Sequence, residues 1–437
     1  MMTAVSGDVR VPVPVRIMKR VTTDALTSAD VSREASPSCR RDLRCRGTGR
    51  LRHRSDAGQP GHARFAGQPA ASASPPGSPA ASSPASAPAP APPEAGTWRL
   101  LSAAPATGPF GSLVSVWTGS QMLIRGVIGG QPPKAVMLSY TPATGAWRTL
   151  APGPAPRTLE GWDNAIWTGR EMLTFGPGGT GAYNPVTGTW RPVTPNMLGM
   201  LGAVRVWTGR QAIFWGGGCC GEAVADGAAY TPAANTWQAL PRAPLSARYA
   251  SGVWTGTEVI IAGGMSPDPA MQVFADAAAY NPATRTWRKL PPMPEPRWGA
   301  TALWDGTEAL FIGGTLADAR GPSAGAVAFS PATGRWRRLP GMEFSRRGFA
   351  AVWTGRQVLV WGGLTGSFQD QEIPPHGVAY DPAANRWSAM PMAPLRGRSN
   401  PAAVWTGRQM IVWGGTIPGP QNNTPATDGA AYRPASR

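Results

Sequence analysis

Short apolar runs alternate with turn residues from residue 96 to the end of the chain. One unit reads AAVW at 350–353, the turn Thr354-Gly355, QVLVWGG at 357–363, GVAY at 377–380, and RWSAM at 386–390 after a proline-containing turn. Glycine accepts positive φ and Pro suits the second position of a turn, so the unit predicts four short antiparallel strands. No window keeps the apolar spacing of a helix.

This unit recurs seven times, at intervals from 40 residues (Trp167 to Trp207) to 52 residues (Trp353 to Trp405). Each unit carries a Trp-Thr-Gly or Trp-Asp-Gly string, which begins at Trp117, Trp167, Trp207, Trp254, Trp304, Trp353 and Trp405. A Gly pair, an aromatic residue two positions before a proline, and a second tryptophan follow in nearly every unit. Four strands repeated at this period are typical of the blades of a β-propeller.

The two ends of the repeat array complement each other. The last unit stops at Tyr432 and lacks a fourth strand, whereas the segment Thr97–Leu101 is a fourth strand without its first three. Pairing the two closes the ring and hides both sheet edges. We therefore predict an all-β fold, a seven-bladed propeller over residues 96–437 that is closed by the N-terminal strand near Trp98.

The first 95 residues have a different composition. Residues 1–65 are polar without a strand or helix period, and residues 66–95 are rich in Pro, Ala and Ser. We expect a disordered segment followed by an extended linker. Linkers of this kind often tether bacterial domains to the cell envelope, which favours an extracytoplasmic, bacterial protein. Charges interrupt the first 20 residues, so no signal peptide is recognisable, and no 18-residue apolar stretch predicts a membrane span.

The charge of the chain and its cysteines narrow the choice of partners. The formal net charge is +17, but the arginines are spread over every repeat, which does not favour nucleic-acid binding. We expect a monomer. Cys39 and Cys45 have no partner pair at zinc spacing. The adjacent Cys219 and Cys220 are either two loop thiols or a vicinal disulfide, and the disulfide would imply an oxidising compartment.

The Gly pair, the Tyr, the Asp/Asn-Pro turn and the following Trp together resemble kelch repeats, over 342 residues from 96 to 437. That family includes galactose oxidase, whose copper site would need several His and Tyr ligands. Only His376 of the three histidines lies in the repeats, so we expect no copper and no other cofactor. Kelch-type propellers also include an N-acetylneuraminate epimerase, which leaves a sugar-directed enzyme as the alternative to a binding or scaffold protein.

Antiparallel strands place the variable loops together. The loops from strand two to strand three, and from strand four to the next blade, share one end of the ring, which we name the loop face. The Trp-Thr-Gly and proline turns share the opposite end, the turn face, which their uniformity suggests is structural. The loop face gathers arginines next to aromatic residues, and we name as candidate ligand contacts Arg157, Arg248, Tyr249, Arg297, Trp298, Arg346 and Arg396.

Arginine beside an aromatic ring suits an anionic ligand, because the guanidinium donates bidentate hydrogen bonds and the ring offers a stacking plane. Proteins, peptides and anionic carbohydrates are the expected partners. The alternative is structural: these arginines bond loop carbonyls and thereby cap neighbouring blades. We name no catalytic residues, because Glu160 and Asp163 are only a weak acid/base pair and His376 has no Ser/Asp set.

Overall fold

The computed structural model describes residues 96–437, apart from 106–107, 109, 131, 157–163, 196–201, 220–221, 267–270, 318–320, 367–370, 375, 420–422 and 436–437. The predicted disordered segment and linker, with Cys39 and Cys45, lie outside the described residues. The described part is built from strands, and none of its residues form a helix that could span a bilayer.

Seven antiparallel sheets form the seven predicted blades, and each contains four strands that run in order from the first to the fourth. The sheets of blades four and six carry one further short strand each. Blades one to three consist of β2 (Phe110–Trp117), β3 (Met122–Ile128), β4 (Lys134–Thr141) and β5 (Ala146–Leu150); β6 (Asn164–Trp167), β7 (Met172–Phe175), β8 (Gly181–Asn184) and β9 (Thr189–Arg191); and β10 (Val204–Trp207), β11 (Ala212–Trp215), β14 (Gly227–Thr231) and β15 (Thr236–Ala239).

Blades four to seven consist of β16 (Tyr249–Trp254), β17 (Val259–Ser266), β19 (Ala277–Asn281) and β20 (Thr286–Leu290); β22 (Thr301–Trp304), β23 (Ala309–Ile312), β25 (Ala326–Ser330) and β26 (Arg335–Leu339); β27 (Arg347–Trp353), β28 (Val358–Gly366), β30 (Val378–Asp381) and β31 (Arg386–Ala389); and β32 (Ala402–Trp405), β33 (Met410–Trp413), β36 (Gly429–Arg433) and β1 (Thr97–Leu100). Short strands decorate the loop face: β12 (Gly218–Cys219), β13 (Glu222–Ala223), β18 (Gln272–Val273), β21 (Arg297–Trp298), β24 (Thr315–Leu316), β29 (Gln371–Glu372), β34 (Thr416–Ile417) and β35 (Thr424–Pro425).

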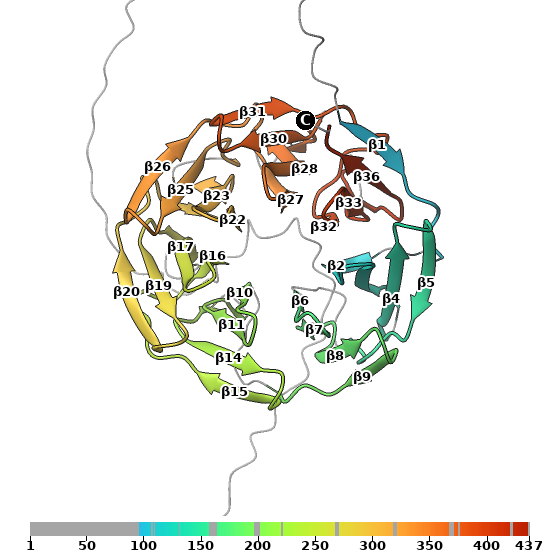
Figure 1. Ribbon diagram of the computed structural model, residues 1–437, viewed down its shortest axis with the longest axis horizontal. Coiled ribbons are helices and arrows are strands. Elements are labelled where there is room, and N and C mark those ends of the chain that lie inside the picture. The colour runs from blue at the N-terminus through green and yellow to red at the C-terminus, as the bar shows by residue number, and fades with distance from the viewer. Residues whose placement is uncertain are drawn as a thin grey trace, which may run out of the picture. The chain divides into compact units, whose positions relative to one another are not determined.

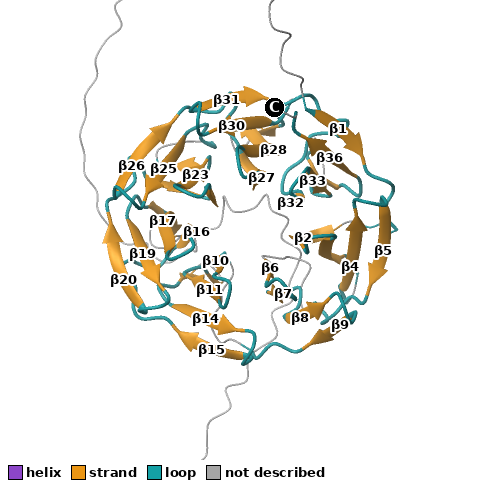
Figure 2. Ribbon diagram, in the orientation of Figure 1, coloured by secondary structure: helices purple, strands orange, loops and turns teal. Residues whose placement is uncertain are grey.

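The blades stand in a ring, with the first strand of each blade nearest the centre and the fourth on the outer rim (Figure 1). The first strands contact one another around the whole ring, including β2 with β32. Strands coloured orange alternate with teal turns around the ring in Figure 2. The predicted seven-bladed, all-β fold is confirmed.

The predicted closure is also confirmed. β1 pairs antiparallel with β36, with Trp98 opposite Tyr432 and Thr97 opposite Arg433, so the fourth strand of blade seven comes from the N-terminal side of the propeller. This pairing covers the edge of β36, which would otherwise present unpaired backbone groups.

The closing tryptophan of each blade lies opposite the aromatic residue of the preceding strand. Tyr280 pairs with Trp287 and Phe329 with Trp336, and the ring centroids of the seven pairs lie 4.8–5.3 Å apart. Tilted aromatic contacts at this distance add to the energy of simple area burial. The repeated Tyr and Trp therefore form one structural unit on the outer half of each blade.

The same tryptophan also joins each blade to the one before it. The indole Nε1–H of Trp336 donates to the carbonyl of Pro291 at 2.7 Å, and all seven closing tryptophans make the equivalent bond at 2.7–3.0 Å. Seven clusters of buried apolar side chains fill the junctions between blades, and the Trp of each Trp-x-Gly string packs against one of them. Packing between blades thus explains both tryptophan series.

The turns have the backbone that their residues predict. Gly355, in a Thr-Gly turn, has a φ of 89°, and Asn385, at the end of a proline turn, has a φ of 47°. Positive φ at the first central position suits a tight hairpin turn. Arg285 occupies the Asn385 position in blade four with a φ of 56°, which is strained for an arginine.

Candidate functional site

The recurrent arginines of the loop face are buried. Arg248, Arg297, Arg346 and Arg398 are each at most 1 % exposed, although they lie in loops that lead into blades four to seven. An arginine guanidinium has five N–H donors and no acceptor, so a buried one needs several carbonyl or carboxylate partners.

Backbone carbonyls supply many of these partners. Arg297 Nη1 donates to the carbonyls of Gly313 at 3.1 Å and Gly325 at 3.0 Å. Arg346 Nη1 donates to the carbonyl of Gly362 at 3.1 Å, and its Nη2 to that of His376 at 2.7 Å. Each guanidinium therefore ties the loop entering a blade to the Gly pair of the same blade.

Carboxylates also accept from three of the four guanidiniums, among them those of Arg248 and Arg398. Arg248 donates both terminal nitrogens to Asp276 and stacks on Phe274, with its guanidinium carbon 3.7 Å from the ring centroid. Arg398 forms an ion pair with Asp428, at 2.6 Å from Nη1 to Oδ1. Burial opposes ionisation of Asp428, but the hydrogen bonds and charge of Arg398 outweigh it, so the pKa of Asp428 lies below its ordinary value.

The positive charge of Arg346 is balanced less than that of the other three buried arginines, which each bind a carboxylate. Its guanidinium donates to backbone carbonyls, and desolvation lowers its pKa to about 10, despite the opposing influence of Glu343. Desolvation also lowers the pKa of Arg297, although Glu295 at 3.2 Å from Nη2 counteracts it. Both side chains are still charged at neutral pH, because arginine loses its proton only in strongly basic solution.

The close packing around these arginines also explains why blades three to six need glycine at their Gly pairs. A Cβ built on Gly263 would lie 2.4 Å from the carbonyl oxygen of Arg297, and one on Gly362 would lie 2.6 Å from that of Arg398. Only glycine permits this approach. The backbone of the arginine that enters each of blades four to seven therefore packs on the Gly pair of the blade before it. The side chains of Arg297, Arg346 and Arg398 also bond the Gly pair of their own blade.

Two arginines differ from the sequence prediction. In blade seven the residue equivalent to Arg297 and Arg346 is Arg398; Arg396, grouped with them from the sequence, lies two residues earlier and is exposed. Arg125 of β3 was missed. It is 1 % exposed and donates to the carbonyls of Pro154 and Gly178. Arg125 therefore lies in blade one but bonds the Gly pair of blade two. Its signal was a single charge inside the apolar strand MLIRGVI.

The predicted aromatic contacts lie directly after the buried arginines. Tyr249 begins β16 and Trp298 ends β21, and both side chains are half-buried. The first strand of blade four, β16, contacts β21 of the loop that enters blade five. Arg157, Glu160, Asp163 and Cys220 lie outside the described residues, and the side chain of Cys219 is not described either. The vicinal disulfide therefore stays a prediction, as does the ligand-binding role of the whole set.

A second polar group stands on the loop face. His376 Nε2 lies 2.8 Å from Glu343 Oε2, and the imidazole makes an edge contact with Phe344. No group of three or more His, Cys, Asp or Glu side chains gathers within the described part of the chain. The donors present there do not fit a copper site, which needs several nitrogen and oxygen ligands.

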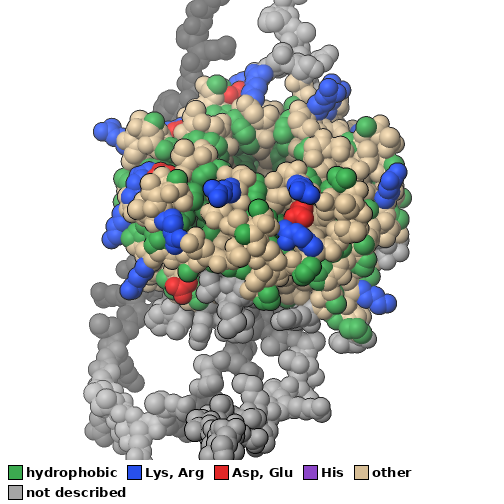
Figure 3. Space-filling model, turned by 60° about the horizontal axis from the view of Figure 1, so that its bottom comes forward, with side chains coloured by type: hydrophobic (Ala, Val, Ile, Leu, Met, Phe, Trp, Pro, Cys, Tyr) green, Lys and Arg blue, Asp and Glu red, His purple; other side chains and the backbone are tan. Residues whose placement is uncertain are grey.

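On the surface that Figure 3 shows, Lys and Arg side chains stand apart instead of forming one basic patch.

Comparison with known proteins supports the fold alone. No family model matches the sequence, and no curated protein sequence matches it. A solved structure described as a novel fungal alcohol oxidase with catalytic diversity among the AA5 family, in complex with copper, matches 78% of this chain and 77% of that chain. The TM-score is 0.58 and the sequence identity 14%. This chain therefore has a galactose-oxidase-like propeller fold, while its resemblance to kelch repeats rests on the repeats themselves.

Proposed function

We propose that this protein is a binding or scaffold propeller that recognises an anionic protein, peptide or glycan on its loop face. The observation that carries the proposal is the placement of Tyr249 and Trp298. Each follows a buried, hydrogen-bonded arginine, so the loop backbone beneath each aromatic side chain is held firmly. A preorganised aromatic contact loses little entropy when a ligand binds.

In this proposal the arginines divide into two roles. The buried guanidiniums of Arg248, Arg297 and Arg346 position the loops, since a ligand could reach them only by displacing their carbonyl partners. The exposed Arg396 supplies charge to the ligand directly. Aromatic side chains with a nearby arginine are the residue types that carry most of the energy in many interfaces. Nothing in the described residues favours the epimerase alternative, and we do not propose it.

Fluorescence anisotropy of the full chain with a labelled polyglutamate peptide and with labelled sialyllactose tests the proposal. Trp298→Ala and Arg396→Ala should each weaken binding about 10-fold, which corresponds to roughly 1.4 kcal/mol. Arg356→Ala, an exposed arginine of the turn face, is the matched control and should bind like the unmodified chain. Absence of binding to both probes, or equal losses in all three variants, would contradict recognition on the loop face.

A further inference from the structure

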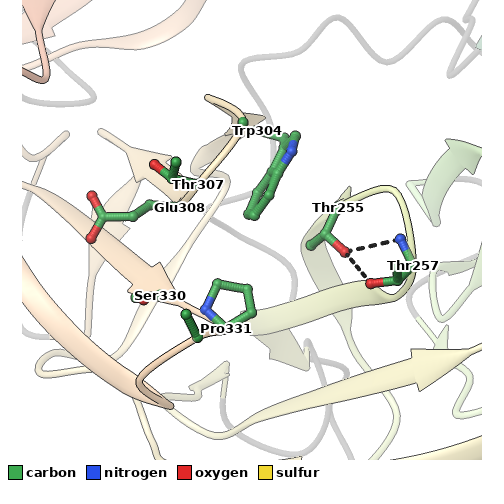
Figure 4. Close-up of a pocket in the computed structure, with 9 residues that line it drawn as sticks. Thr255, Thr257, Trp304, Thr307, Glu308, Ser330 and Pro331 are labelled. Atoms are coloured by element: carbon green, nitrogen blue, oxygen red, sulfur yellow. Dashed lines mark hydrogen bonds between the residues drawn. The ribbon is translucent and has the colours of Figure 1, made fainter.

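A pocket of about 580 Å³ opens on the turn face, at the junction of blades four and five (Figure 4). Its size falls within the roughly 300–1,000 Å³ of small-ligand sites. It is lined by Thr255 and Thr257 of blade four and, from blade five, by Trp304, Gly306, Thr307, Glu308, Ser330, Pro331 and Ala332. It lies on the face opposite the proposed loop-face site and is independent of that proposal.

The seven turns of the Trp-x-Gly strings explain why a pocket is present at this junction. The third residue after the tryptophan is an arginine in four turns, at Arg170, Arg210, Arg356 and Arg408. It is Ser120 in blade one, and it is threonine only in blades four and five, at Thr257 and Thr307. Every other junction has an arginine on at least one side, whose long side chain can cover the space. The junction of blades four and five has none.

One wall of the pocket is an aromatic plane. The indole of Trp304 is half-buried and packs against the core cluster between blades four and five, which includes Ile260 and Phe311. Figure 4 shows it between the Thr255 turn and the side with Glu308 and Pro331. Because its inner edge is packed, the ring keeps its place and presents a rigid apolar surface, whose negative face attracts polarised C–H groups.

The polar groups around the indole are also held in place. Thr255 Oγ1 accepts from the backbone N–H of Thr257 at 3.3 Å, and Thr307 Oγ1 donates to Asp305 at 2.9 Å. Two nitrogens of Arg337 bind Glu308, with 2.6 Å from Nη2 to Oε2. That hydrogen bond raises the pKa of Arg337 above its ordinary value. The carboxylate charge is therefore balanced, but its oxygens keep further lone pairs for hydroxyl donors.

A flat apolar plane ringed by fixed hydroxyls and a neutralised carboxylate matches one kind of ligand. A cation would gain little from a carboxylate already paired, and an anion would find no cationic side chain among the lining residues. A pyranose ring offers a face of C–H bonds to the indole and equatorial hydroxyls to the rim. We propose that this pocket binds a neutral pyranoside, with the sugar ring stacked on Trp304 and its hydroxyls bonded to Thr257, Thr307 and Glu308.

Saturation-transfer NMR of the full chain tests this site with methyl β-D-glucopyranoside, methyl β-D-galactopyranoside and methyl α-D-mannopyranoside as probes. We expect saturation of the ring C–H protons of at least one glycoside, and a Thr257→Arg variant should reduce that affinity at least about 10-fold. The variant installs the residue that four other turns already carry at this exposed position, so its melting temperature should not change.

A gain-of-site variant gives the complementary measurement. The junction of blades three and four has Trp254, Thr257 and a Glu258–Arg288 ion pair at 2.6 Å. It differs in carrying Arg210 at the position that Thr257 has in the pocket, and Asn281 at the position of Ser330. Arg210→Thr should therefore open a second pocket and about double the number of glycoside sites per chain. Absence of saturation for all three glycosides, or a Thr257→Arg chain that binds as before, would overturn the proposal. An Arg210→Thr chain with an unchanged number of sites would do the same.

Discussion

On the loop face, Arg248, Arg297, Arg346 and Arg398 are at most 1 % exposed and bond the carbonyls and carboxylates of their own blades. On the turn face, Arg170, Arg210, Arg356 and Arg408 stand at turn tips and are exposed. Both sets recur in four blades, so recurrence alone does not reveal a role. The difference lies in the acceptors within reach. Loop backbones leave carbonyls unpaired, whereas each short turn satisfies its own polar groups.

The largest effect is expected from breaking the ring that both faces share. Removing residues 1–103 deletes β1 and exposes β36, so we expect aggregation or loss of a cooperative melting transition in calorimetry. Removing residues 1–95 keeps β1 and should leave the melting temperature nearly unchanged. Equal melting of the two truncated chains would contradict closure by β1.

The contrast between buried and exposed arginines can be measured within one loop. Arg398→Ala removes the partners of Asp428 and of the Gly414 carbonyl, and should lower the free energy of unfolding by about 2–4 kcal/mol. Arg396→Ala, two residues earlier and exposed, should change it by less than about 0.5 kcal/mol. Urea denaturation of both variants gives the comparison. A similar loss in both would mean that burial does not separate the two roles.

A small gain in stability is expected on the turn face. Asn235 and Asn385 adopt positive φ and accept a hydrogen bond from the tyrosine hydroxyl of their own blade, at 2.7 and 2.8 Å. Arg285 occupies this position in blade four at a φ of 56°. Arg285→Asn should relieve the strain and offer Tyr280 an acceptor, and so raise the free energy of unfolding by roughly 0.5–1 kcal/mol. An unchanged or lower urea midpoint would refute this account.

The sequence predicted the residues of the candidate sites less well than it predicted the fold. Sequence spacing correctly placed Tyr249 and Trp298 after arginines at the start of successive blades, but it grouped Arg396 with Arg297 instead of Arg398. Two arginines in three residues cannot be ranked by spacing, since only the packed loop shows which guanidinium reaches Gly414. The turn face was expected to be merely structural, because the short threonines at 257 and 307 matter only once blades four and five lie side by side.

The sequence by itself determined the number of blades, their strands and turns, and the closing strand at Trp98. These features depend on local chemistry: alternating apolar positions, glycine at positive φ, and a pattern that repeats until one strand is missing. Tertiary structure alone decided which arginines are buried, why each closing tryptophan is needed, and where a pocket opens. Each of these depends on an acceptor or a wall from a neighbouring segment, as with Trp336 and the Pro291 carbonyl, which lie 45 residues apart and meet only when blades four and five pack together.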